Sequence, residues 1–266
     1  MVWMILALVL LSLVVFTRVY LYGSDLANYD LPLGEQFGAG REASDAHDEV
    51  VASLSVGAGP IRQAPRKEQL RLMREYMDQM SDGLPLASTF TPTDAGGVSA
   101  EWVLAPGADT SRRLLYIHGG AFVMGSPRSH RNITDRFAQL TGCAVLSIDY
   151  RLMPEHSRSA GIEDCRTAYE WLLENGPDGS APTQKIFIAG DSAGGNLALM
   201  MSAWSRDSGS RKADAVVALS PHTDATLGSP SMRSNIETDA MLGPMFRGLA
   251  KIPRPLLLWV GLLQNR

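Results

Sequence analysis

A serine at a predicted strand–turn–helix junction is the residue of this chain best suited to do chemistry. Residues 185–189 form a short apolar run that is typical of a buried strand, and residues 197–204 form an Ala-, Leu- and Met-rich run that favours a helix. Between them, residues 190–194 read Gly-Asp-Ser-Ala-Gly. This is a G-x-S-x-G pattern in the structural context that a nucleophilic serine requires. A chance match in a glycine-rich turn is the alternative.

The spacing within this motif has a chemical reason. A serine hydroxyl is a weak nucleophile, so Ser192 must be presented on a sharp turn where a base can reach it. Gly190 and Gly194 would allow that turn, because side chains there would clash. The amides of the following helix, beginning at Ala193, would face the negative charge that develops on an acyl oxygen. We predict that Ser192 is the nucleophile and that Asp191 supports the turn.

A second glycine-rich loop follows an earlier apolar run. Residues 114–117 predict a strand, and the loop that follows begins His-Gly-Gly. Such a loop can place backbone N–H groups opposite the nucleophile and complete an oxyanion hole with the residue after the serine. His118 is expected to brace this loop rather than to act as the base. The candidate oxyanion donors are the amides of Gly119, Gly120, Ala121 and Ala193.

Three linked motifs resemble those of one known family. Residues 118–122 (His-Gly-Gly-Ala-Phe), 149–156 (Asp-Tyr-Arg-Leu-Met-Pro-Glu-His) and 190–196 (Gly-Asp-Ser-Ala-Gly-Gly-Asn) are similar in order and spacing to the hormone-sensitive-lipase-like esterases, bacterial family IV. The resemblance covers about residues 60–261. It implies an α/β-hydrolase fold and a serine carboxylic ester hydrolase that acts on short to medium acyl esters through an acyl-enzyme on Ser192. It implies no metal and no organic cofactor.

The base and the acid of a catalytic triad are not assigned. They follow the serine in this fold, in the order Asp or Glu and then His. In the resembled family the acid comes just after the strand that matches Leu256–Val260, and the histidine lies further on. Neither position exists among the 266 residues, so we interpret the chain as truncated at its C-terminus, with the last strand and helix missing. His222 is the one histidine after Ser192, and we interpret it as a loop residue.

Two other functions stay open for this reason. The plant gibberellin receptors are relatives that use the same pocket to bind a ligand, so a non-catalytic small-molecule-binding protein is one alternative. An inert fragment of an α/β-hydrolase is the other.

Composition excludes several classes of protein. A chain of 266 residues with 45% hydrophobic and 20% charged residues can bury a large core. Its net charge of −4 gives no reason to expect a nucleic acid partner. The two cysteines, Cys143 and Cys165, fall in a predicted strand and a predicted helix, so they indicate neither a disulfide framework nor a zinc site.

The N-terminal segment, residues 1–22, is predicted to be a membrane anchor. Residues 2–16 carry no charge, and continuing to Tyr22 gives a length that can span a bilayer, with Arg18 and the tyrosines at its surface. No basic region precedes the run and no clear cleavage site follows it. The position of Arg18 favours a cytoplasmic catalytic domain. A cleaved signal peptide, which would make the protein secreted or periplasmic, is the alternative.

The remaining chain divides into three predicted regions. Residues 23–60 are expected to be a linker with a short helix at Ser44–Leu54, and residues 61–95 an N-terminal cap region. In the cap, residues 64–80 show helical spacing with a Met-rich face, which the resemblance implies covers the active site. Residues 96–266 are expected to be the hydrolase domain, incomplete at its C-terminus.

Strands and helices alternate in this last region. This alternation predicts a mostly parallel sheet with helices on both faces. We expect Val98–Leu104 and Arg112–Ile117 to pair as a hairpin ahead of that sheet. Further strands are predicted at Cys143–Ile148, 185–189, Asp214–Leu219 and Leu256–Val260, and helices at Ser129–Leu140 and Ile162–Leu173.

Overall fold

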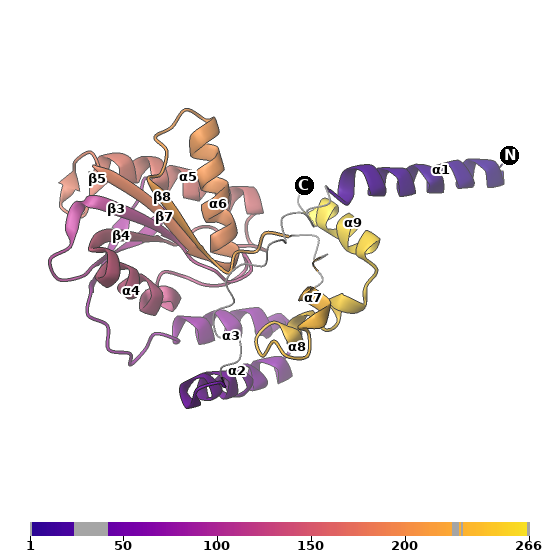
Figure 1. The fold of residues 1–266 in the computed structure, drawn as a ribbon, viewed down its shortest axis with the longest axis horizontal. Helices are drawn as coiled ribbons and strands as arrows, with labels where there is room; N and C mark the ends of the chain where they lie inside the picture. Colours follow the sequence, from indigo (N-terminus) through magenta and orange to yellow (C-terminus); the bar gives the residue numbers. More distant parts are fainter. Residues whose placement is uncertain (1, 24–41, 225–228, 230, 265–266) are drawn as a thin grey trace. The chain divides into compact units, whose positions relative to one another are not determined.

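The computed structural model describes residues 2–23, 42–224, 229 and 231–264. These residues form two compact units, one running from Ile61 to Thr223 and the other made of the described parts of residues 1–60 and 224–266. The first unit contains the sheet, and the second contains the N-terminal and C-terminal helices (Figure 1). Of the linker predicted at 23–60, residues 24–41 lie outside the described residues.

A mixed sheet forms the centre of the first unit. Its strand order is β1-β2-β4-β3-β7-β8, with β4, β3, β7 and β8 parallel to one another and β1 and β2 running antiparallel beside them. The strands are β1 Thr89–Asp94, β2 Ser99–Leu104, β3 Asp109–Ile117, β4 Cys143–Ile148, β7 Lys185–Asp191 and β8 Ala215–Leu219. A small separate hairpin joins β5 Asn175–Gly176 to β6 Gly179–Ser180. The prediction of a mostly parallel central sheet is confirmed.

Helices cover both faces of this sheet (Figure 1). The helices of the first unit are α3 Arg66–Asp78, the short 3-10 turn η3 Arg128–His130, α4 Arg131–Thr141, α5 Arg158–Glu174 and α6 Ser192–Asp207. On one face, Leu115 and Ile117 of β3 pack in a buried cluster with α5 and α6, while Leu114 and Tyr116 pack with α4 on the other face. This alternation follows from the two-residue period of a strand, which sends successive side chains to opposite faces of the sheet.

The predicted hairpin between Val98–Leu104 and Arg112–Ile117 is wrong. Strand β2 pairs with β1 and β4, and β3 pairs with β4 and β7, so β4 lies between the two strands that we expected to be neighbours. Every residue of β4 is buried. A strand that is apolar on both faces is stable only inside the sheet, and the short connection between β2 and β3 does not prevent this.

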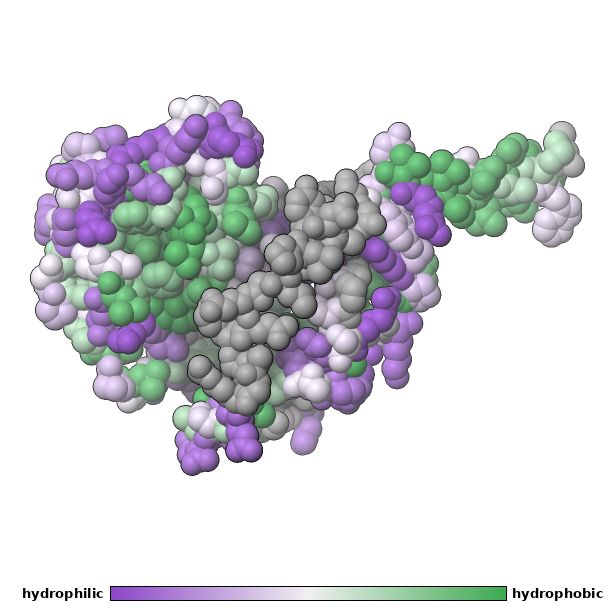
Figure 2. All heavy atoms as spheres, in the orientation of Figure 1, coloured by the Kyte–Doolittle hydropathy of each residue, from purple (hydrophilic) through white to green (hydrophobic). Residues whose placement is uncertain are grey.

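The second unit begins with an apolar helix. Helix α1 spans Val2–Phe16 and continues as a π-helical turn, η1, over Thr17–Leu21. Figure 2 shows hydrophobic side chains along its exposed surface. In the part of the chain that the structure describes, Val2–Leu21 is the one helix long and apolar enough to cross a membrane, and an N-terminal signal sequence would meet the same criterion. Helix α2, at Asp45–Gln63, begins one residue after the predicted helix at Ser44–Leu54 and continues beyond its end.

The strand predicted at Leu256–Val260 is instead a helix. The C-terminal elements are α7 Ser231–Ser234, α8 Gly243–Phe246, the 3-10 turn η4 Leu249–Lys251 and α9 Arg254–Gln264. A short apolar run does not distinguish a strand from a helix by periodicity. Two features favour the helix here: leucine has a high helix propensity, and Pro255 occupies a first-turn position where a missing N–H costs nothing.

Candidate active site

Ser192 lies at the junction of β7 and α6 and is exposed. Its backbone φ is 52°, in the left-handed region that residues with a side chain rarely adopt. Asp191, the preceding residue, is the N-cap of α6 and still has an extended backbone. The chain therefore reverses within one residue, and this lifts the Ser192 side chain away from both the strand and the helix.

The two glycines that flank the turn have no room for a side chain. A Cβ atom at Gly194 would lie 1.9 Å from the carbonyl oxygen of Ile117, and one at Gly190 would lie 2.4 Å from the carbonyl oxygen of Gly194. The backbone of the turn thus packs directly against the end of β3, from which the His-Gly-Gly loop departs. Contact between the two backbones positions that loop relative to Ser192.

The loop itself is tightly coiled. Gly120, Ala121 and Phe122 all have positive φ, at 115°, 56° and 63°. The N–H groups of Val123 and Met124 both donate to the Gly120 carbonyl, at 3.1 and 3.0 Å. Left-handed conformations at two residues with side chains are costly, so the rest of the structure must hold them.

The Asp191 carboxylate joins the serine turn to the loop. Its Oδ1 accepts hydrogen bonds from the backbone N–H of Gly119 (2.9 Å) and the hydroxyl of Tyr116 (2.7 Å). Its Oδ2 lies 3.4 Å from Nε2 of His130. Burial alone would raise the pKa of Asp191, but hydrogen bonds from His130, Tyr116 and Gly119 outweigh it and hold the pKa below its usual range. A charged carboxylate therefore sits directly behind Ser192.

These contacts distinguish the amides that the sequence suggested as oxyanion donors. The Gly119 N–H is already donated to Asp191, so it is not available to a substrate oxygen. Within the described residues, no hydrogen bond uses the N–H of Gly120 or Ala121. The N–H of Ala193 lies in the first turn of α6, where amides have no helical partner. Within the described residues, three of the four candidate amides thus make no hydrogen bond to the chain.

His118 is fully buried behind the loop. Its Nδ1 lies 2.7 Å from the Gly119 carbonyl oxygen, and its ring stacks on Tyr150 with centroids 4.4 Å apart. The Tyr150 hydroxyl donates to the His118 carbonyl (3.0 Å). Burial, together with the nearby His130, lowers the pKa of His118 to about 3, so the ring is neutral near pH 7. This geometry suits a brace and not a base.

The backbone of His222 lies against the serine turn. Its N–H donates to the Ser192 carbonyl (3.0 Å), and the Asn196 side chain donates to the His222 carbonyl (2.8 Å). The segment comes directly after β8, where Ser220 has a φ of 43°. Among the residues that the structure describes, no hydrogen bond joins the Ser192 hydroxyl to a histidine or a carboxylate. The geometry therefore identifies neither a base nor an acid.

Two arginines fasten the 149–156 segment, and one of them, Arg74, also holds the loop. Arg74 of α3 donates to the carbonyl oxygens of Val123 (2.8 Å) and Met153 (3.0 Å) and forms a bidentate pair with Glu155 (2.8 and 2.9 Å). Arg151 pairs with the carboxylate of Asp164 in α5 at 2.7 Å. The 149–156 motif is thus built into the scaffold.

Sequence reasoning missed Tyr116, His130 and Arg74 as contributors to the site. Each acts through a partner far away in the chain. A tyrosine in a strand, a histidine before a helix and an arginine on an amphipathic helix carry no local pattern that would reveal such a partner.

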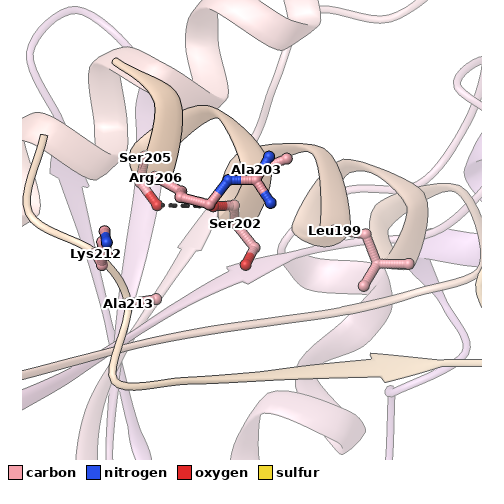
Figure 3. Close-up of a pocket in the computed structure, with 7 residues that line it drawn as sticks. All are labelled: Leu199, Ser202, Ala203, Ser205, Arg206, Lys212 and Ala213. Carbon is pink, nitrogen blue, oxygen red and sulfur yellow. Dashed lines mark hydrogen bonds between the residues drawn. The ribbon is translucent and has the colours of Figure 1, made fainter. Parts of the chain in front are cut away.

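Other possible sites lie outside this arrangement. In residues 2–23, 42–224, 229 and 231–264, no group of three His, Cys, Asp or Glu side chains could hold a metal ion, and Cys143 and Cys165 are buried free thiols. Figure 3 shows a pocket in which the Ser205 hydroxyl donates to the Ser202 carbonyl. It is lined by Leu199, Ser202, Ala203, Ser205, Arg206, Lys212 and Ala213. None of the candidate site residues lines it.

Comparison with known proteins gives consistent matches. A family model described as the alpha/beta hydrolase fold matches residues 114–251. The chain is 41% identical over 155 residues to the carboxylesterase/phospholipase LipF of Mycobacterium tuberculosis, covering 57% of this chain and 40% of the relative. It is 39% identical over 142 residues to an acetyl-hydrolase of Streptomyces hygroscopicus, covering 53% of this chain and 45% of the relative. The chain thus spans less than half the length of these relatives.

A solved structure matches over more of the chain. It is an esterase from the bacterial hormone-sensitive lipase family, with 32% sequence identity and a TM-score of 0.67. The match covers 84% of this chain and 69% of that one.

Proposed function

The chain belongs to the hormone-sensitive-lipase-like family of α/β-hydrolases, and from that premise we propose that it carries the nucleophile and the oxyanion donors of a serine carboxylic ester hydrolase. One observation carries the proposal: an exposed Ser192 with a φ of 52° is fixed beside a left-handed loop that has open amides. Strain of this kind persists only where the surrounding structure holds it, and it is typical of functional sites.

The reaction would begin with attack of Ser192 Oγ on an ester carbonyl. The tetrahedral intermediate carries a negative oxygen, and the N–H groups of Gly120, Ala121 and Ala193 are the proposed donors to it. Collapse of the intermediate expels the alcohol and leaves an acyl-enzyme, which water then hydrolyses. A base must accept the Ser192 proton, and we assign that role to no residue.

Asp191 is proposed as a positioning residue rather than a catalytic one. Its carboxylate accepts hydrogen bonds from Gly119 and Tyr116, so it fixes the loop to the residue next to the nucleophile. Gly190 and Gly194 support the same turn by leaving room for the backbone of β3. The donors are thereby set in place before a substrate binds, which is the condition for efficient electrostatic stabilisation.

The proposed substrates are esters of short to medium acids. Support comes from α3, because Arg74 fastens this helix to the loop at Val123. Met73 and Met77 lie on α3 and are half-buried. Flexible thioether side chains can repack around acyl groups of different length. We propose residues 61–95 as a cap region and residues 96–266 as the hydrolase domain.

Hydrolysis of p-nitrophenyl acetate, butyrate and hexanoate by the full chain tests this function. We expect release of nitrophenolate from all three esters and its loss in the Ser192→Ala variant. The Ser202→Ala variant is the matched control, since it removes a hydroxyl from the same helix outside the site. Turnover that survives in Ser192→Ala would contradict the assignment of the nucleophile, and turnover of acetate alone would contradict the acyl range.

A non-catalytic binding protein is the second candidate. It is favoured by one observation, that no described histidine or carboxylate is hydrogen-bonded to the Ser192 hydroxyl. In that case p-nitrophenyl esters would bind without turnover, and Ser192→Ala would bind them equally well.

We also propose that Val2–Leu21 is a membrane anchor. Its surface is apolar and exposed over the length of the helix, and Arg18 and Tyr20 occupy the end that leads into the rest of the chain. Aromatic and basic residues at the end of a span are typical of the membrane surface. Resistance of the full chain to extraction from membranes by alkaline carbonate would support an anchor, whereas recovery of a shortened soluble chain would indicate a cleaved signal.

A further inference from the structure

Helix α9 exposes an apolar face. Leu256 and Val260 are 57% and 49% exposed, and residues four apart lie on the same side of a helix. Leu258, which points across the helix from them, is only 6% exposed. Helix α9 carries no acidic residue. The exposed face of α9 is thus apolar, whereas a surface helix of a protein in water exposes polar residues.

The same helix is attached to the end of the proposed anchor. The indole N–H of Trp259 donates to the Thr17 hydroxyl (2.8 Å), and the Trp259 ring lies 5.5 Å from that of Phe16. The Arg254 guanidinium lies 4.7 Å from the ring centroid of Tyr22. Thr17 is 6% exposed although the helix around it is exposed. Helix α9 therefore packs where the uncharged helix ends.

This junction has the composition of a membrane surface. Tyr20, Tyr22 and Trp259 supply aromatic rings with a polar end, which are enriched at the level of the lipid headgroups. The Arg18 guanidinium also lies over the Tyr22 ring, 5.2 Å from its centroid, so this ring contacts two cations. Lys251, one turn before α9, is exposed.

The length of α9 decides how it could meet a membrane. Eleven residues rise about 16 Å along the helix axis, roughly half the hydrocarbon thickness of a bilayer. The helix cannot cross the membrane. It can lie in the surface plane with one face among the acyl chains, as interfacial helices do.

We propose that α9 is an interfacial membrane helix, held beside the exit of the anchor, with Leu256 and Val260 inserted among the acyl chains. Arg18, Lys251 and Arg254 would face the phosphates of anionic headgroups. The partner is a lipid surface, and the proposal rests on α1 being an anchor. It goes beyond ester hydrolysis, because it places a C-terminal segment of the chain on the membrane.

Site-directed spin labels can test this arrangement. Single cysteines replace Leu256, Val260, Val9 or Leu140 in the full chain, which is reconstituted into vesicles of phosphatidylcholine and phosphatidylglycerol. The native Cys143 and Cys165 are buried and should not react. Leu140, which is 70% exposed on α4, is the matched control for a leucine in water. The measurement is collision of each label with oxygen, which enters lipid, and with a water-soluble nickel chelate.

Each outcome has a defined meaning. We expect the labels at 256 and 260 to collide more with oxygen than with the chelate, as the label at 9 does, and the label at 140 to show the opposite. If the label at 9 is in lipid while those at 256 and 260 collide with the chelate, α9 lies in water and the proposal is overturned, although the anchor stands. Shielding of 256 and 260 from both reagents would indicate packing against protein, this copy or a second, and would also overturn it. A label at 9 in water would reject the anchor and α9 together.

Discussion

At the scale of single residues, the site depends on hydrogen bonds between its motifs and on buried groups outside them, such as Tyr116 and His130. The motif contains Ser192 and the flanking glycines. The Asp191 carboxylate joins the serine turn to the loop because it accepts hydrogen bonds from the Tyr116 hydroxyl and the Gly119 amide. Because the Gly119 N–H is donated to Asp191, we do not propose it as an oxyanion donor. The sequence suggested four amides as candidate donors, and the hydrogen bonds distinguish Gly119 from the other three.

His118 gives a prediction about pH. Its pKa is about 3 in the folded chain and about 6.5 in an unfolded one, so below pH 6.5 only the unfolded chain takes up the proton. The free energy of unfolding is therefore unaffected by this group above pH 6.5 and falls between pH 6.5 and 3, by at most about 1.4 kcal/mol per pH unit. His118→Asn should remove this part of the slope. Urea unfolding at several pH values measures it.

The matched control for that experiment is His156→Asn, a change at an exposed imidazole. It should keep the slope of the parent chain. Equal slopes for the parent and for His118→Asn would mean that the buried ring does not resist protonation as the structure implies.

At the scale of elements, the junction of β7 and α6 is more constrained than either element alone. A Cβ at Gly194 would meet the Ile117 carbonyl oxygen at 1.9 Å, whereas one at Gly195 would meet Pro221 at 3.1 Å. Both glycines lie in the same helical turn. The backbone of β3, and not helix propensity, should decide which of them can be replaced.

We expect Gly194→Ala to lower thermal stability strongly, because the serine turn and β3 must separate to admit the methyl group. Gly195→Ala should be tolerated far better, since alanine favours a helix over glycine by about 1 kcal/mol and offsets the tighter contact. Thermal unfolding followed by circular dichroism compares the two variants. Equal effects would indicate that the close backbone approach at residue 194 is not needed.

Helix α3 gives a second prediction at this scale. Arg74 joins it to the Val123 carbonyl in the loop, while the ion pairs of Arg71 among the described residues are with Glu68 and Glu75 of the same helix. Arg74→Ala should loosen the loop and slow acylation of Ser192, and Arg71→Ala should not. The rate at which an organophosphorus inhibitor labels Ser192 covalently measures this difference in reactivity. An unchanged rate in Arg74→Ala would show that α3 does not hold the donors.

The elements also show how far sequence reasoning reaches. Strands such as Cys143–Ile148 and helices such as Ile162–Leu173 were predictable because their apolar patterns are long and consistent with one fold. The pairing of the strands was not predictable, because the position of β4 between β2 and β3 depends on its burial from both faces of the sheet. The Leu256–Val260 run was ambiguous by periodicity, and its contact with Thr17 and Phe16 is not visible locally.

At the scale of the whole molecule, the chain combines a unit that holds the sheet and the serine turn with a second unit that holds the N-terminal and C-terminal helices. It spans 40% of the length of LipF and 45% of the length of the Streptomyces acetyl-hydrolase. Family membership was predictable from three linked motifs, because their order and spacing are specific. The position of a base was not predictable. Among the described residues, no histidine or carboxylate is hydrogen-bonded to the Ser192 hydroxyl.

The most direct measurement is labelling of the purified full chain with a fluorophosphonate probe, followed by mass spectrometry of the labelled peptide. The probe reacts with an activated serine and requires no particular ester. We expect one adduct on Ser192, absent from Ser192→Ala and present in Ser202→Ala. A folded sample that takes up no probe, or takes it up at another serine, would contradict the claim that this turn presents a working nucleophile.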